Sequence, residues 1–261
     1  MIDTIYIPSL GRSHMQKSFS NMAPTAQRIT KIVVQPFEQH KYKDFPIIVL
    51  PENDCGITLT RKFIWAHGKN KRYMVMDDDI LMKTRLFGEE KSKRTMTEED
   101  WCYMLDTVSK WMDEGIAWGG CRSCLPPAGR EYIENSGTAE VFFFDGNQLP
   151  SADELDWSLS TAEDISLSLQ LLSKGYRNRI FDRFVYQSDF VGTEGGCLTM
   201  GRNMDMINNN HAKLIEKFPE YVSWNGEKEI RGETMKKIKV MYKKAYLDSQ
   251  KSKANLLDFM Q

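Results

Sequence analysis

Three consecutive aspartates, Asp77 to Asp79, are the residues of this chain that point most directly to chemistry. They follow the apolar run 73–76, which has the composition of a buried strand. Adjacent carboxylates repel one another, and a hard divalent cation such as Mg2+ or Mn2+ relieves that repulsion because it prefers oxygen ligands. At the end of a strand in an open α/β sheet, such an ion would lie where nucleotides bind. The alternative is an acidic turn that caps the next segment.

A second acidic pair, Glu163 and Asp164, opens a predicted helix that ends at Gly175. A carboxylate at a helix start in a cleft can accept a proton from a hydroxyl, and the nearby backbone N–H groups would keep it ionised. The alternative is structural, because Thr161 and Asp164 match a capping box in which each side chain bonds a backbone N–H group. From the local residues alone, the capping box is the more common outcome.

Strands and helices that would hold these acids alternate along the chain. A helix is expected over 57–66, ending at Gly68 and carrying Arg61 in its middle. A second helix begins at the capping-box pair Thr97 and Asp100 and ends at Gly115. The predicted strands are 5–8, 31–35, 46–51, 73–76, 116–120, 139–144 and 184–187. This alternation predicts an α/β protein.

The remaining segments are expected to be loops and a tail. The polar segment 81–94 and the Pro- and Gly-rich segment 124–137 are predicted loops. The run 188–197 contains three glycines and is either a strap that closes on phosphates or a plain connector. We predict one domain over 1–203 and a basic, helical extension over 204–261 that packs on it.

The charge distribution permits local contact with a polyanion, although the formal net charge is only −1. Five basic residues and no acid occupy 61–72, and seven lysines against one acid occupy 234–253. The alternative for each basic segment, including 81–94, is a solvated face. By contrast, 145–164 holds six acids and no base.

The composition favours a soluble globular protein. Hydrophobic residues make up 41% of the chain, and no apolar stretch approaches the roughly 20 residues of a membrane span. The N-terminus lacks a basic leader, so we expect a cytoplasmic protein, in the host cytoplasm if a phage encodes it. Cys121 and Cys124 form a lone C-x-x-C pair, and we expect the five cysteines to be reduced thiols.

The order of these motifs resembles that of the GT-A nucleotide-sugar glycosyltransferases. The shared features are a strand and turn at the start, a helix with a central arginine, an Asp-x-Asp after a strand and a later Glu-Asp pair. Within that fold, the opening 5–12, the run 195–197 and Arg202 are similar to the TET-associated glycosyltransferases of bacteriophages, which add sugars to 5-hydroxymethylpyrimidines in DNA. The resemblance covers about 5–196 and implies a Rossmann-like mixed sheet flanked by helices, with a helical C-terminal extension.

The resemblance also implies a donor site for a UDP-sugar with Mn2+ or Mg2+. Arg61 would contact the nucleotide or its diphosphate. Asp79 would bind the metal, and Asp77 would bind the ribose, the metal or a metal-bound water. The other residues expected at the nucleotide are Pro8, Ser9, Arg12 and Asp78. Many GT-A enzymes add a histidine ligand after the last strands. Here either His211 reaches the metal or the site uses only carboxylate, diphosphate and water.

On the acceptor side, the resemblance implies Asp164 as the catalytic base beside Glu163. A base that deprotonates the attacking hydroxyl from the face opposite the leaving diphosphate gives inversion. A hydroxymethylated base inside duplex DNA would have to be flipped out or presented single-stranded to reach this site. Three alternatives remain: a glycan or protein acceptor, a nucleotide- or nucleic-acid-binding module without chemistry, and a metal-dependent nuclease. Neither the sugar, the acceptor base nor the oligomeric state can be read from the sequence.

Overall fold

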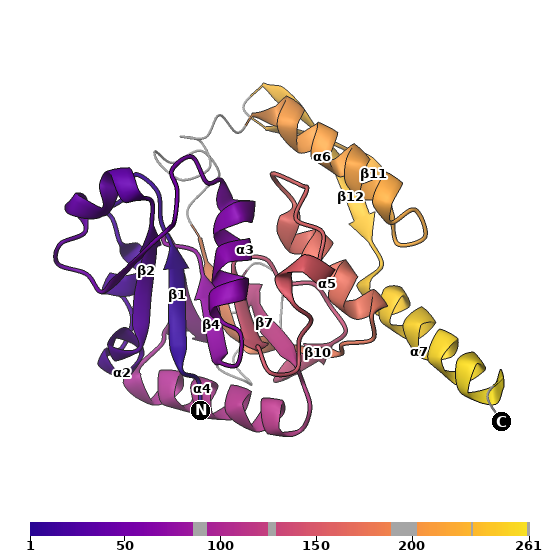
Figure 1. The fold of residues 1–261 in the computed structure, drawn as a ribbon, viewed down its shortest axis with the longest axis horizontal. Helices are drawn as coiled ribbons and strands as arrows, with labels where there is room; N and C mark the ends of the chain where they lie inside the picture. The colour runs from indigo at the N-terminus through magenta and orange to yellow at the C-terminus, as the bar shows by residue number, and fades with distance from the viewer. Residues whose placement is uncertain (86–92, 125–128, 189–202, 231, 260–261) are drawn as a thin grey trace.

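A computed structural model describes residues 1–85, 93–124, 129–188, 203–230 and 232–259 of the chain (Figure 1). The strands are β1 (Thr4–Pro8), β2 (Thr30–Val34), β3 (Ile47–Val49), β4 (Arg72–Met76), β5 (Leu81–Arg85), β6 (Lys93–Thr95), β7 (Trp118–Ser123), β8 (Tyr132–Glu134), β9 (Val141–Asp145), β10 (Asn178–Gln187), β11 (Val222–Ile230) and β12 (Glu233–Val240). The helices are α1 (Lys17–Ser20), α2 (Pro24–Arg28), α3 (Ile57–His67), α4 (Glu98–Asp113), α5 (Glu163–Ser173), α6 (Met204–Lys217) and α7 (Tyr242–Phe259), with 3-10 turns at Pro36–Lys41 and Ala152–Glu154.

A mixed sheet flanked by helices forms the body of the molecule, as predicted. Its strand order is β3-β2-β1-β4-β9-β7-β10-β5-β6, with β8 also paired to β10. The first four strands of this order are parallel to one another, whereas β9 is antiparallel to both of its neighbours. The strands β11 and β12 form a separate hairpin.

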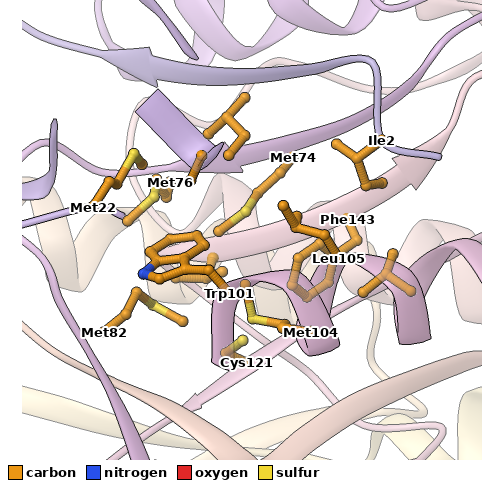
Figure 2. Close-up of a cluster of buried hydrophobic side chains, with 14 of the residues drawn as sticks. Ile2, Met22, Met74, Met76, Met82, Trp101, Met104, Leu105, Cys121 and Phe143 are labelled. Atoms are coloured by element: carbon orange, nitrogen blue, oxygen red, sulfur yellow. The ribbon is translucent and has the colours of Figure 1, made fainter. Parts of the chain in front are cut away.

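Side-chain alternation along β4 divides the interior into two cores. Met74 and Met76 enter the core that α4 covers, where Figure 2 shows them near Trp101 and Met104 of that helix. Tyr73 and Val75 enter the opposite core, which α3 and α5 cover. Both faces of the strand are therefore apolar, which is why 73–76 is an uninterrupted apolar run.

The topology brings several strand ends to one edge of the sheet. β1 and β4 are parallel neighbours, so the segments that follow them leave at the same edge. β9 is antiparallel to β4 and begins at that edge, with Val141 opposite Met76. The residues after β1, after β4 and before β9 therefore meet, and this edge carries the candidate site.

The predicted C-terminal end of α3 and the predicted N-terminal start of α4 were both confirmed. α3 ends at His67 with Gly68 as its C-cap, and α4 begins with the capping box of Thr97 and Asp100. Cys121, from the C-x-x-C pair, lies in the core drawn in Figure 2. Within the described residues, no helix is both long and apolar enough to span a bilayer.

Three loop or helix predictions were wrong in part. The segment 81–94 contains β5 and β6, because β10 provides an antiparallel partner for β5 despite its polar residues. The segment 124–137 contains β8, which also pairs with β10. The extension is helical in α6 and α7, but 222–240 forms the β11–β12 hairpin. The predicted strap 188–197 lies almost wholly in 189–202, outside the described residues, as does Arg202.

Candidate active site

The three aspartates after β4 differ in how far their side chains are exposed. The side chain of Asp77 is 29% exposed and that of Asp79 is 21% exposed, whereas that of Asp78 is only 6% exposed. The outer two carboxylates therefore reach the surface at the sheet edge while the middle one points into the protein.

Asp78 is held by the turn that follows β1. Its carboxylate accepts hydrogen bonds from Ser9 Oγ at 2.6 Å and from Arg12 Nη1 at 2.6 Å. Burial raises the pKa of Asp78 to about 6, although the Arg12 charge and these hydrogen bonds oppose the rise. The same Arg12 nitrogen lies 3.0 Å from Asp79 Oδ2. The predicted nucleotide residues Ser9, Arg12 and Asp78 are thus brought together in one hydrogen-bonded group.

Arg61 joins the aspartates to the second acidic pair. From the middle of α3, its Nη2 donates to Asp77 Oδ1 at 2.9 Å and its Nη1 donates to Glu163 Oε1 at 2.8 Å. Burial opposes the positive charge, but the nearby carboxylates of Asp77, Glu163 and Asp164 raise the pKa of Arg61, so it stays protonated. Its guanidinium also lies 5.4 Å from the centre of the Phe142 ring.

Asp164 lies in the first turn of α5 beside this network, and its capping-box alternative is wrong. The N-cap of α5 is Ala162, which makes no side-chain cap and has a left-handed backbone with φ 60° and ψ 22°. Thr161 precedes this N-cap residue, and its hydroxyl accepts a hydrogen bond from Asn210 Nδ2. The charge of Asp164 contributes to the raised pKa values of Arg61 and Asp77, which indicates that the predicted base lies within the same charge cluster.

Glu140 belongs to the site although no motif marked it. It directly precedes β9, and its backbone oxygen accepts a hydrogen bond from Asp77 N at 3.1 Å. Burial raises the pKa of Glu140 to about 7, and the charges of Asp77 and Asp79 add to the rise. Its Oε2 is buried and has no hydrogen-bond partner among the residues that the structure describes. In the sequence, Glu140 is marked only as an acid immediately before the apolar run 141–144. Which residues surround it depends on the strand order of the sheet.

The site carries an excess of negative charge. Its acids are Asp77, Asp78, Asp79, Glu140, Glu163 and Asp164, and its bases are Arg12 and Arg61. Burial also raises the pKa of Glu163, so this carboxylate is held partly in its neutral form despite the adjacent Arg61. A crowded set of oxygen donors with too few cations can hold a hard metal ion.

The predicted third metal ligand is not supported. In the described part of the chain, no three His, Cys, Asp or Glu side chains are arranged to hold a metal ion. His211 lies on α6, and its Nδ1 is 2.7 Å from the backbone oxygen of Lys236 in β12. The aspartates and Glu140 are the acids that the fold brings to the sheet edge.

Comparison with known proteins gives a family and two relatives. The family model described as TET-Associated Glycosyltransferase matches residues 4–196. Two proteins named Beta-glucosyl-HMC-alpha-glucosyl-transferase, from Enterobacteria phages T6 and T2, are each 26% identical over 209 residues, which cover 74% of this chain and 74% of each relative. The crystal structure of S. aureus TarS 1-349 in complex with UDP-GlcNAc matches with a TM-score of 0.48 at 11% identity, covering 82% of this chain and 67% of that one.

Proposed function

Because the chain belongs to the TET-associated glycosyltransferase family, we propose that it transfers a sugar from a UDP-sugar to a hydroxyl of a 5-hydroxymethylated pyrimidine in DNA, with Mn2+ or Mg2+. The names of the phage T6 and T2 relatives, which specify glucosyl transfer to a glucosylated HMC, support this acceptor class. By the same names, an acceptor that already carries one sugar belongs among the substrates to be tested.

The observation that carries the proposal is the alternation of the three aspartates. Asp77 and Asp79 reach the surface at the edge where strand ends meet, and Asp78 locks the turn after β1 beneath them. An acidic turn that served only as a cap would not need this division between two outward carboxylates and one inward carboxylate. The geometry supports a donor site at this edge.

The residues present fit a hard divalent ion. Asp77 and Asp79 would hold it, and their charges act on Glu140, whose buried Oε2 has no hydrogen-bond partner within the described part of the chain. When bound, such an ion supplies positive charge for the oxygens of a departing diphosphate. Arg61 supplies a second, permanent positive charge, because its neighbours keep it protonated.

Asp164 would act as the base toward the acceptor hydroxyl, while Glu163 binds Arg61. Attack from the face opposite the leaving group then inverts the sugar carbon. The relatives' names specify an alpha-glucosyl product, and from an α-linked donor that product requires retention. The anomeric configuration of the product, read from the coupling constant of its anomeric proton, therefore tests the assignment of Asp164 as a base for direct displacement.

The basic segments differ in how many of their basic side chains are exposed and so able to contact DNA. In the segment 61–72, Arg61 lies inside the site and Arg72 pairs with Asp113 and Asp145. In the segment 234–253, most of the lysines on β12 and α7 are exposed. Exposed Trp224 lies beside them, with the nitrogen of Lys236 5.9 Å from its ring. Cations with an exposed aromatic suit contacts with phosphates and bases, so we place the DNA track on 234–253.

The test is incubation of hydroxymethylated DNA, with and without a first glucose, with the protein, Mn2+ and a panel of nucleotide sugars. Mass spectrometry of the released nucleosides should show a gain of one sugar with one donor, and omission of the metal should abolish it. Donor hydrolysis without transfer to DNA would move the acceptor to a glycan or protein. DNA cleavage without a nucleotide sugar would replace the proposal with a nuclease.

A further inference from the structure

The turn that leads into α5 has an unfavourable backbone conformation. Ala162, the residue directly before Glu163 and Asp164, is in the left-handed region with φ 60°. Residues other than glycine and asparagine rarely adopt this backbone region, because their Cβ atom is crowded there. Such a conformation persists only where the surrounding structure holds it, and it recurs at functional sites.

Two helices hold the residues immediately before Ala162. Asn210 of α6 is buried, and its Nδ2 donates to Thr161 Oγ1 at 3.0 Å and to Ser160 Oγ at 3.1 Å. From the other side, Thr58 Oγ1 of α3 donates to the backbone oxygen of Leu159 at 2.6 Å. The turn is therefore clamped between the helix that carries Arg61 and a helix of the C-terminal extension.

The extension also approaches Asp164 at a second point. Tyr242, the first residue of α7, packs against the same core as α5. A Cβ placed on Gly137 would lie 2.2 Å from Tyr242 Cζ, so this ring occupies the space that a side chain would need. Burial raises the pKa of the Tyr242 hydroxyl, and the charge of Asp164 adds to the rise. In Figure 1 the extension, coloured orange to yellow, lies on the α5 side of the molecule.

We propose that Asn210 is a positioning residue that fixes the turn at Thr161 and Ala162 and thereby aims Asp164, which makes the C-terminal extension part of the catalytic unit. The family match ends at residue 196, so this role falls on a segment beyond it. The inference rests on the proposed function only in taking Asp164 as the base. A displacement of about 1 Å in a catalytic group can lower turnover about 100-fold, so a single buried amide can matter this much.

The first experiment separates turnover from donor binding. Asn210→Ala should lower kcat about 10- to 100-fold and leave the donor KM unchanged, because Arg61 and the aspartates are untouched. Thr161→Val, which removes the hydroxyl at the other end of the same hydrogen bond, should reproduce the loss, and the double variant should be no worse than either single variant. The matched control is Asn208→Ala in the same helix, because Asn208 bonds Thr234 and Lys236 of the hairpin and not the turn. Wild-type kcat in Asn210→Ala would overturn the proposal.

The second experiment is a rescue. Glycine adopts the left-handed region without a Cβ clash, so Ala162→Gly should lessen the need for the clamp. In the Asn210→Ala background it should recover part of the lost kcat. An unchanged or lower kcat in that background would show that the loss does not arise in this turn and would overturn the proposal.

A measurement without substrate keeps the inference independent of the acceptor. In Asn210→Ala, amide hydrogen exchange of residues 161–166 should accelerate at least 10-fold, while exchange in β1 and β4 stays unchanged. If the wild-type protein transfers no sugar to DNA, the proposed function fails and this exchange result still decides the clamp. Unchanged exchange at 161–166 would overturn it, as would an equal acceleration across the whole domain.

Discussion

Arg61 Nη1 donates a hydrogen bond to Glu163 Oε1 across 2.8 Å, and this contact joins α3 to the first turn of α5. Both side chains are buried, with 8% and 11% of their surface exposed. Because the second terminal nitrogen of Arg61 binds Asp77, one guanidinium connects the aspartates after β4 to the helix that begins with Glu163 and Asp164. Removing it would leave the carboxylates of Asp77 and Glu163 without their shared cation.

Arg61→Met should therefore destabilise the fold strongly. Breaking a buried ion pair by removing one partner costs about 3–5 kcal/mol, because the remaining charge loses its compensation. The control is Lys62→Met in the same helix, since Lys62 lies 3.7 Å from Asp153 and both side chains are exposed. That change should alter the free energy of unfolding by less than about 0.5 kcal/mol. Urea unfolding of both variants gives the comparison, and equal effects would contradict the bridging role of Arg61.

Asp77 and Asp79 are more exposed than Asp78, so we expect their substitutions to lower metal-assisted binding and the substitution of Asp78 to lower stability. Asp77→Asn and Asp79→Asn should each weaken Mn2+-assisted binding of a nucleoside diphosphate on the order of 10-fold or more, because each removes an outward carboxylate. Asp78→Asn should mainly lower the free energy of unfolding, by about 1–3 kcal/mol, because it disturbs buried hydrogen bonds to Ser9 and Arg12. Titration calorimetry and urea unfolding measure the two quantities. Loss of metal-assisted binding in Asp78→Asn alone would reverse the assignment.

Local patterns in the sequence were sufficient for the elements around the site. The apolar run 73–76 predicted β4 because both faces of that strand are buried. Gly68 marked the end of α3, and Thr97 marked the start of α4. Motif order also grouped Arg61 with Glu163, although 102 positions separate them.

Features that depend on contacts between distant parts of the chain could not be predicted from local sequence patterns. Glu140 lies beside Asp77 only because β9 pairs antiparallel with β4, and no local pattern records that pairing. Residues 222–230 are mostly exposed, so they lack the apolar alternation that would have marked β11. Ala162 adopts the left-handed region without being glycine, and the contacts that hold it come from distant helices.

The role of Asp164 predicts a loss of turnover without a loss of donor affinity. Asp164→Asn should lower kcat about 100- to 10,000-fold, because general base catalysis by a positioned side chain contributes that much. The dissociation constant of the nucleotide sugar should stay within a factor of about two of the wild-type value, since Arg61 and the aspartates remain. Asp156→Asn is the control, because Asp156 precedes the same helix but pairs with Lys217 at the surface. A wild-type kcat in Asp164→Asn would exclude Asp164 as the base.

The neutral form of Glu163 predicts how stability depends on pH. Burial raises the pKa of Glu163 above the ordinary value of 4.5, so the folded protein binds this proton more tightly than the unfolded chain does. The contribution of this group to the free energy of unfolding is therefore greatest at low pH and falls as pH rises from 4.5 toward neutrality, by about 1.4 kcal/mol for each unit of pKa difference. Glu163→Gln keeps the size of the side chain and an oxygen for Arg61 but cannot ionise. Its free energy of unfolding should fall less than that of the wild type over this window.

Urea unfolding at a series of pH values without added metal measures both curves. The gap between them should widen in favour of Glu163→Gln as pH rises, because only the wild type must ionise a buried carboxyl group. Asp156→Asn again serves as the control, since Asp156 lies beside Lys217 and a Ser158 hydrogen bond that lower its pKa. Its curve should run parallel to the wild type above pH 4.5. Parallel curves for Glu163→Gln would mean that Glu163 is fully ionised beside Arg61, and Glu163 would then contribute a full negative charge to the site.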